Sequence, residues 1–457
     1  MKRMILLFMM LPALARPQEV RIAVPYTMFT LPNGLTVILH EDHTTPTVSV
    51  NTWYHVGSGR EKPGRTGFAH LFEHLMFMGS GNVPEGKFDQ WLEAAGGNNN
   101  GSTSEDRTNY FEDVPSNALE LPLFLESDRM AYLLKSMTEE DVNLQRDVVK
   151  NERRQNYEDA PYGMASIILG ENLFPADHPY HWPTIGYMED LSAASYEDVV
   201  EFFRSYYGPN NASLSIAGDI DPVRTRALVE KWFADVPAGR PVPPLAPPAA
   251  VLTEEKRLFT EDKVSLPRLY MAWLTPAVFR PGDAELDILA NVLAGGKNSR
   301  LYRRLVYELQ IAQDVEAYQG SQALVSTFMI VATARAGHTL TEIETVINEE
   351  IGKLKTVAPG ARELGRAVNR FEASFLDRLE MVGGFSGKAE LLNSYYVRTG
   401  NPDYFQEDLA RYRAIDPQDL SAVALTFLRE EARVVLSIVP VGKKDLASGN
   451  GKEVKAK

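Results

Sequence analysis

The hydrophobic pattern of the first quarter of the chain predicts strands followed by one buried helix. Residues 26–31 and 35–39 are rich in apolar side chains and are separated by the turn signal Pro32-Asn33-Gly34. Residues 47–56 alternate apolar and polar positions, which is typical of a strand. Residues 67–79 are apolar on every side of a helix, which indicates burial. Further helices are expected at 88–95, 117–135 and 138–157, and a strand at 108–114.

The second half of the chain repeats this order weakly. Residues 264–275 again predict a strand, and a helix over 286–294 ends at Gly295-Gly296. Between the copies lies a proline-rich stretch that is typical of a semi-rigid linker. We interpret the chain as two homologous α+β domains from a duplication. The expected segments are a signal peptide (1–15), a first domain (16–238), a linker (239–252), a second domain (253–445) and a disordered tail (446–457).

The N-terminus predicts export. Lys2 and Arg3 precede a short apolar run, and Ala13-Leu14-Ala15 is a small-residue cleavage site. The mature protein is therefore expected to be periplasmic or secreted. This N-terminal run is too short for a membrane span, and no other apolar run approaches the necessary length.

Charge and cysteine content narrow the chemistry. The net charge of −14 argues against nucleic acid as a partner. The absence of cysteine excludes disulfides, thiolate metal ligands and a cysteine nucleophile. Any transition metal must be held by histidine and carboxylate side chains.

The buried helix carries a candidate metal site. It contains His70-Leu-Phe-Glu73-His74, and residues four apart on a helix share one face. Two imidazoles beside a carboxylate form the core of a zinc hydrolase site, and H-x-x-E-H is the inverse of the common H-E-x-x-H motif. A purely structural role for three titratable groups among Phe, Leu and Met is less favourable, because their burial is costly.

A third protein ligand is needed, since catalytic zinc keeps three ligands and one open position. Glu152 is the best candidate because it follows Val148 and Val149 at helical spacing and is expected to share their buried face. Asp147 and Glu158 remain alternatives. The other histidines are interpreted as surface or packing residues: His40, His43, His55, His178, His181 and His338.

These motifs resemble the pitrilysin, insulinase and mitochondrial processing peptidase group of zinc peptidases. The resemblance covers about residues 25–440 and rests on Gly67-Phe-Ala-His-Leu-Phe-Glu-His, Gly96-Gly-Asn-Asn-Asn-Gly-Ser-Thr-Ser, Val148-Val-Lys-Asn-Glu-Arg-Arg and Gly295-Gly-Lys-Asn-Ser-Arg-Leu-Tyr. It implies mostly antiparallel sheets covered by helices, with one chain forming half of a clamshell. It also implies Zn²⁺ on His70, His74 and Glu152, and Glu73 as general base. The substrate backbone would lie on an edge strand at Asn100, Gly101, Ser102, Thr103 and Ser104.

Three positions depart from the family pattern. Gln145 stands where a second glutamate is frequent, and Val306 and Gln313 stand where an Arg and a Tyr often hold the substrate carbonyl. The resemblance therefore implies a paralogous, zinc-less partner chain that carries the Arg and the Tyr, with a homodimer as the alternative.

The expected function is zinc metalloendopeptidase activity on oligopeptides or unfolded segments. Two alternatives are a non-catalytic scaffold subunit of an assembly and a peptide-binding module with a structural zinc. The scaffold subunit predicts eroded ligands, whereas all four expected residues are present here. The structural zinc predicts a fourth protein ligand, and none is evident.

Overall fold

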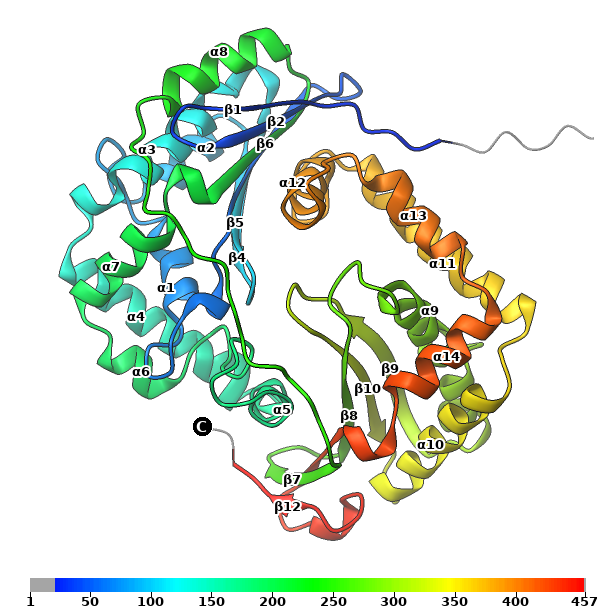
Figure 1. Cartoon of the computed structure of the whole chain (residues 1–457). Coiled ribbons are helices and arrows are strands. Elements are labelled where there is room, and N and C mark those ends of the chain that lie inside the picture. Colours follow the sequence, from blue (N-terminus) through cyan, green and yellow to red (C-terminus); the bar gives the residue numbers. More distant parts are fainter. Residues whose placement is uncertain (1–20, 456–457) are drawn as a thin grey trace, which may run out of the picture.

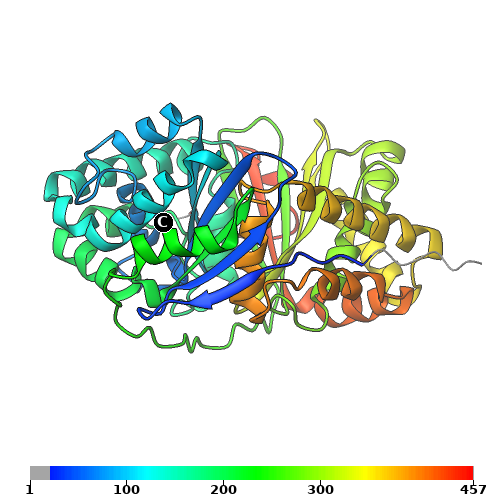
Figure 2. The same cartoon turned by 90° about the horizontal axis from the view of Figure 1, so that it is seen from above.

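The computed structural model describes residues 21–455 and consists of two halves, each built on a six-stranded sheet (Figure 1). The predicted signal peptide, residues 1–15, lies outside the described residues. Seen from above, the two halves lie side by side with helices on the outside of each (Figure 2). Residues 237–255 contain neither helix nor strand and connect the last helix of the first half to the second sheet.

The first sheet has the strand order β1-β2-β6-β3-β5-β4. Only β2 and β6 pair in parallel, and every other pair is antiparallel. The central strands are buried on both faces, which is why their sequences are nearly continuous in apolar and small residues. The strands are β1 (Thr27–Thr30), β2 (Thr36–Glu41), β3 (Thr47–Tyr54), β4 (Asn98–Thr103), β5 (Thr108–Pro115) and β6 (Ala212–Gly218).

The second sheet repeats this arrangement in the order β12-β7-β11-β8-β10-β9. Its parallel pair β7 and β11 occupies the place of β2 and β6, so the two halves share one topology, as a duplication predicts. The outer strands differ, since β12 is parallel to β7 whereas β1 is antiparallel to β2. The strands are β7 (Lys256–Asp262), β8 (Arg268–Thr275), β9 (Ala312–Gly320), β10 (Ser326–Ala334), β11 (Val434–Pro440) and β12 (Lys452–Glu453).

Helices complete both halves. Those of the first half are α1 (Phe68–Leu75), α2 (Lys87–Ala94), α3 (Glu120–Ser136), α4 (Glu139–Arg153), α5 (Ala165–Leu173), α6 (Met188–Ala193), α7 (Tyr196–Tyr206) and α8 (Pro222–Phe233). Those of the second half are α9 (Asp283–Ala294), α10 (Leu340–Thr356), α11 (Ala361–Glu380), α12 (Lys388–Thr399), α13 (Phe405–Arg413) and α14 (Pro417–Phe427). Two π-helical segments are η3 (Arg154–Glu158) and η5 (Tyr302–Glu308). Short 3₁₀ turns are η1 (Ser58–Arg60), η2 (Ser116–Ala118), η4 (Pro209–Asn211), η6 (Glu430–Ala432) and η7 (Lys444–Leu446).

One helix of each half packs against the sheet of the other half. Leu169 of α5 packs in one apolar cluster with Leu436 of the second sheet. In return, Leu392 of α12 clusters with Ile38 of the first sheet. The amide of Asn393, also on α12, donates to the backbone oxygen of Asn51 at 2.8 Å. The helices α5 and α12 therefore join the two halves through buried contacts.

Two expectations about chain segments need correction. The tail, residues 446–457, was expected to be disordered, yet its described part is ordered: Ser448 N donates to Ser437 Oγ at 3.0 Å and β12 extends the second sheet. Hydrogen bonds to the second sheet hold this segment in an ordered conformation despite its polar composition. The helix expected over 138–157 ends as an α-helix at Arg153 and widens into the π-helical segment η3.

Candidate metal centre

The helix α1 presents the motif on one face. Its other positions are apolar and buried in the core of the first half, so the pattern of burial leaves His70, Glu73 and His74 on the side facing α4 and β4. Glu61 fixes the start of this helix, because its carboxylate accepts the backbone N–H groups of Gly67 at 2.9 Å and Ala69 at 2.8 Å. Nothing in the sequence pattern signals this cap, since Glu61 lies in a loop.

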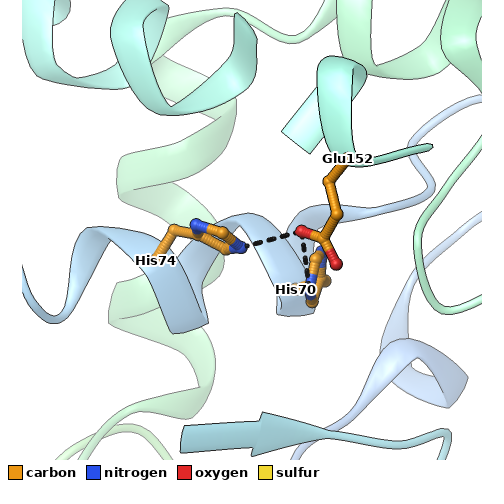
Figure 3. A group of neighbouring side chains, drawn as sticks. All are labelled: His70, His74 and Glu152. Atoms are coloured by element: carbon orange, nitrogen blue, oxygen red, sulfur yellow. Dashed lines mark ion pairs between the residues drawn. The ribbon is translucent and has the colours of Figure 1, made fainter. Parts of the chain in front are cut away.

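Two histidines and one glutamate meet between α1 and α4 (Figure 3). The Nε2 atoms of His70 and His74 lie 3.7 Å and 3.3 Å from Glu152 Oε2, and the three ligand atoms all lie within 4.8 Å of one another. Tetrahedral zinc with bonds of about 2.0–2.1 Å separates its ligand atoms by roughly 3.3 Å. The spacing therefore fits one zinc ion. No other group of three potential ligands occurs within residues 21–455.

The protonation of the cluster also suits a metal. Burial lowers the pKa of His70 to about 4, which keeps its imidazole neutral, as a ligand must be. The hydrogen bond from His74 lowers the pKa of Glu152, and partial burial opposes that effect. The Nδ1 atom of His70 is buried without a hydrogen-bond partner in the described structure.

The hydrophobic pattern around Glu152 explains its position only in part. Val149 is fully buried, as expected, but Val148 is 40% exposed, so the apolar face is narrower than the pattern suggests. The competing acids lie elsewhere: Asp147 is 74% exposed beside Lys150, and Glu158 pairs with Arg153. The structure thus brings only Glu152 to the two histidines.

Glu73 stands beside the cluster with a carboxylate that none of the three ligands engages. The hydroxyl of Thr103 on β4 donates to Glu73 Oε2 at 2.6 Å, and this is its one hydrogen bond within the described residues. Burial raises the pKa of Glu73, and the Thr103 bond opposes that rise. The geometry is suited to a general base that accepts and returns a proton.

The strand β4 forms the outer edge of the first sheet, next to Glu73. Asn100, Gly101, Ser102 and Thr103 lie on it, whereas Ser104 lies in the turn that follows. A Cβ atom at Gly101 would lie 3.2 Å from Glu73 Cγ and 3.0 Å from the ring of Tyr110. Glycine therefore permits the close approach of this strand to the base.

The second half keeps the helix without the ligands. On α9 the positions that match the motif are Asp287, Ala290 and Asn291; Asp287 is half-buried and accepts the hydroxyl of Tyr412 at 2.7 Å. Val306 packs in the core of the second half, and Gln313 lies exposed on β9.

Gln145 and the six histidines outside the cluster make hydrogen bonds with other parts of the protein. Gln145 Nε2 donates to Met78 Sδ at 2.7 Å. Each of the other histidines has a hydrogen-bond partner outside the cluster: His40, His43, His55, His178, His181 and His338. None of the helices in residues 21–455 combines the length and apolar character needed to cross a bilayer.

Comparisons with known proteins agree with this architecture. Residues 36–167 match the family model "Insulinase (Peptidase family M16)", and residues 193–371 match "Peptidase M16 inactive domain". The chain is 28% identical to the zinc protease PqqE of Helicobacter pylori, over 90% of this chain and 92% of the relative. A crystal structure of a protease from Helicobacter pylori superposes with a TM-score of 0.86 at 26% identity and covers 92% of this chain and 100% of that chain.

A third comparison shows the fold alone. The periplasmic protease PqqL of Escherichia coli is 18% identical with a TM-score of 0.74, and the match covers 95% of this chain but 52% of that one. This chain thus has the fold of about half of PqqL. The two family models together span more than half of the sequence. The chain belongs to the insulinase family of M16 peptidases.

Proposed function

We propose that the chain is a zinc metalloendopeptidase in which His70, His74 and Glu152 hold the metal and Glu73 is the general base. The observation that carries the proposal is the convergence of three ligand atoms beside a fourth, free carboxylate. The names of the relatives support the same class of enzyme. Zinc at this position would lower the pKa of a water molecule toward about 7 and polarise the peptide carbonyl.

The side chains of this protein supply the proton transfer. Glu73 takes a proton from the attacking water and returns it to the leaving amine. The Thr103 hydroxyl holds one oxygen of Glu73 and thereby leaves the other to face the water. An extended peptide on the free edge of β4 would gain main-chain hydrogen bonds with little demand on its sequence. Oligopeptides and unfolded segments fit this mode of binding.

A pair of glutamine variants tests the assignment. Glu73→Gln should keep zinc and lose activity by roughly 10²–10⁴-fold, because only the base is removed. Glu152→Gln should lose zinc as well, as measured by metal analysis. Zinc binding by the wild-type chain without hydrolysis of any peptide, either alone or together with candidate partner chains, would contradict the proposal and favour a scaffold or a structural zinc. Full retention of zinc by Glu152→Gln would show that another carboxylate is the ligand.

We also propose that the enzyme works as a heterodimer with a paralogue. Val306 is buried and Gln313 is a neutral amide on β9, so the positions that match the family's Arg and Tyr lack those donors. Losing one donor to a developing oxyanion costs about 10²–10³-fold in rate. The chain has the fold of about half of PqqL, which leaves room for a second chain to complete the clamshell. Full activity of the chain expressed alone, as a monomer or homodimer on size exclusion, would contradict the heterodimer.

The proposed location is the periplasm or the exterior of the cell. It rests on the charge and apolar pattern of residues 1–15. N-terminal sequencing of the protein recovered from a periplasmic fraction should find a chain that begins at Arg16.

A further inference from the structure

A cavity of about 570 Å³ lies between the two halves beside the strand β4. Its walls come from both halves: Trp53 on β3 and His55 just after that strand, the turn at 105–107, the linker at 244–245, and residues 278–280 and 397–398 of the second half. The cavity is therefore bounded by both halves of this chain.

Four arginines line this cavity: Arg60, Arg107, Arg280 and Arg398. None of them has a carboxylate oxygen within 4.0 Å among the described residues. This gathering of cations is unexpected in a chain whose net charge is −14. A cleft lined mostly by one sign of charge concentrates ligands of the opposite sign.

The acidic neighbours of the arginines are engaged or buried. Asp106 accepts the Tyr180 hydroxyl at one oxygen and the backbone N–H of Ala323 at the other, at 2.9 Å. Burial raises the pKa of Glu105, and burial raises the pKa of Glu390 on α12 to about 7. Among the described residues, none of these three acids lies within ion-pair distance of an arginine of the cavity, and Glu105 and Glu390 act on Arg107 through longer-range charge alone.

Arg107 connects the cavity to the candidate catalytic site. Its Nη1 atom donates to the backbone oxygen of Ser102 on β4 at 2.8 Å, one residue before Thr103, which holds Glu73. Its guanidinium carbon lies 5.5 Å from the centre of the Trp53 ring. Burial lowers the pKa of Arg107, so a half-buried cation is kept here at a cost that an arriving carboxylate would relieve.

We propose that this arginine-lined cavity binds a carboxylate of the peptide substrate and gives the enzyme a preference for acidic peptides. The inference rests on the proposed peptidase function and names its substrate class. The carboxylate belongs either to an aspartate or glutamate side chain or to the C-terminus of the peptide. Both fit the same chemistry, because arginine pairs with carboxylates through two parallel hydrogen bonds.

Binding to the zinc-loaded Glu73→Gln protein separates this inference from catalysis. Labelled peptides of one parent sequence are compared by fluorescence anisotropy. One series replaces a single Asp or Glu by its amide at successive positions, and a second pair differs only in a free or amidated C-terminus. We expect the carboxylate to tighten binding by about tenfold or more in one of the two series. The difference should shrink as salt is added.

Two variants identify the residues responsible. The double variant Arg280→Gln with Arg398→Gln should lose most of the preference while binding the neutral peptide as before, since both side chains are exposed and have no ion pair in the described structure. The charge-reversed double variant Arg280→Glu with Arg398→Glu should instead bind a peptide with lysine at that position more tightly than the acidic peptide. Arg362→Gln is the matched control, because Arg362 is an exposed arginine on α11 outside the cavity.

The outcomes are distinct from those of the peptidase test. Equal binding of acidic and neutral peptides, or a preference that survives the double variant, would overturn the cavity's role even if wild-type enzyme cleaves peptides. Conversely, a charge-dependent preference in a chain that cleaves no peptide, either alone or with a candidate partner chain, would uphold the carboxylate site and refute the peptidase.

Discussion

Thr103 is the residue whose loss should isolate the positioning of the base. Its hydroxyl donates the one hydrogen bond that the Glu73 carboxylate receives within the described residues, at 2.6 Å. The variant Thr103→Val keeps the shape of the side chain and the backbone of β4 but removes the donor. A hydrogen bond to a charged group contributes about 1.5–3 kcal/mol, which corresponds to about 10- to 150-fold in rate if it acts only on the reacting geometry.

The assay is steady-state hydrolysis of a quenched fluorescent peptide, with zinc content measured on the same preparations. We expect kcat to fall within that range while KM and zinc stay near wild type, because the strand and the three ligands are unchanged. Thr103→Ser should restore most of the activity, since it returns the hydroxyl. A wild-type kcat for Thr103→Val would refute the idea that this bond holds the base. A joint loss of zinc would show that Thr103 supports the metal instead.

Further predictions concern packing, pH and metal. Gly101→Ala should lower kcat without loss of zinc, because its Cβ would press on Glu73 and the Tyr110 ring at 3.2 Å and 3.0 Å. The control Gly352→Ala, inside α10 with no atom within 4 Å of its Cβ, should instead raise the free energy of unfolding by about 0.5–1 kcal/mol in chemical denaturation. Burial raises the pKa of Asp287 from 3.8 to about 7, so the folded state binds this proton more tightly and stability falls as pH rises through 7. Asp287→Asn should remove that slope and be more stable than wild type at pH 8, by up to about 4 kcal/mol; equal pH profiles in calorimetry would contradict the assignment. Chelation of zinc should lower the thermal midpoint, since the ligands connect α1 to α4 and a ligand at 100 times its Kd stabilises by about 2.7 kcal/mol; an unchanged midpoint after verified removal would argue against that link.

The sequence was most informative where chemistry and periodicity coincide. The motif at His70 fixes three side chains on one helical face because helix geometry is local. The repeat formed by the strand at 264–275, the helix at 286–294 and the glycine pair Gly295-Gly296 indicates two related halves, and the matching strand orders of the two sheets agree. The buried face expected beside Glu152 is only half correct, because Val149 is buried whereas Val148 is 40% exposed, and the structure still places Glu152 beside the two histidines.

The features that could not be predicted from the sequence are those formed by contacts between segments far apart in the chain. The bond from Thr103 to Glu73 joins β4 to α1, and no spacing rule relates those two positions. The pattern of apolar residues does not reveal that α5 and α12 each pack on the sheet of the other half. The gathering of Arg107 and Arg398 likewise needs the tertiary fold, because nearly 300 residues separate them.

The exchange of α5 and α12 has a consequence for biosynthesis. A nascent chain that has reached only the linker cannot yet cover Ile38 with Leu392, because that leucine has not been made. The apolar face of α5, with Leu169, similarly waits for strands that follow the linker. The first half should therefore expose apolar surface until almost the whole polypeptide has been synthesised. A gene fragment that stops at the linker should yield aggregates. A protease nick within residues 237–255 of the finished protein should, by the same contacts, leave the two pieces associated.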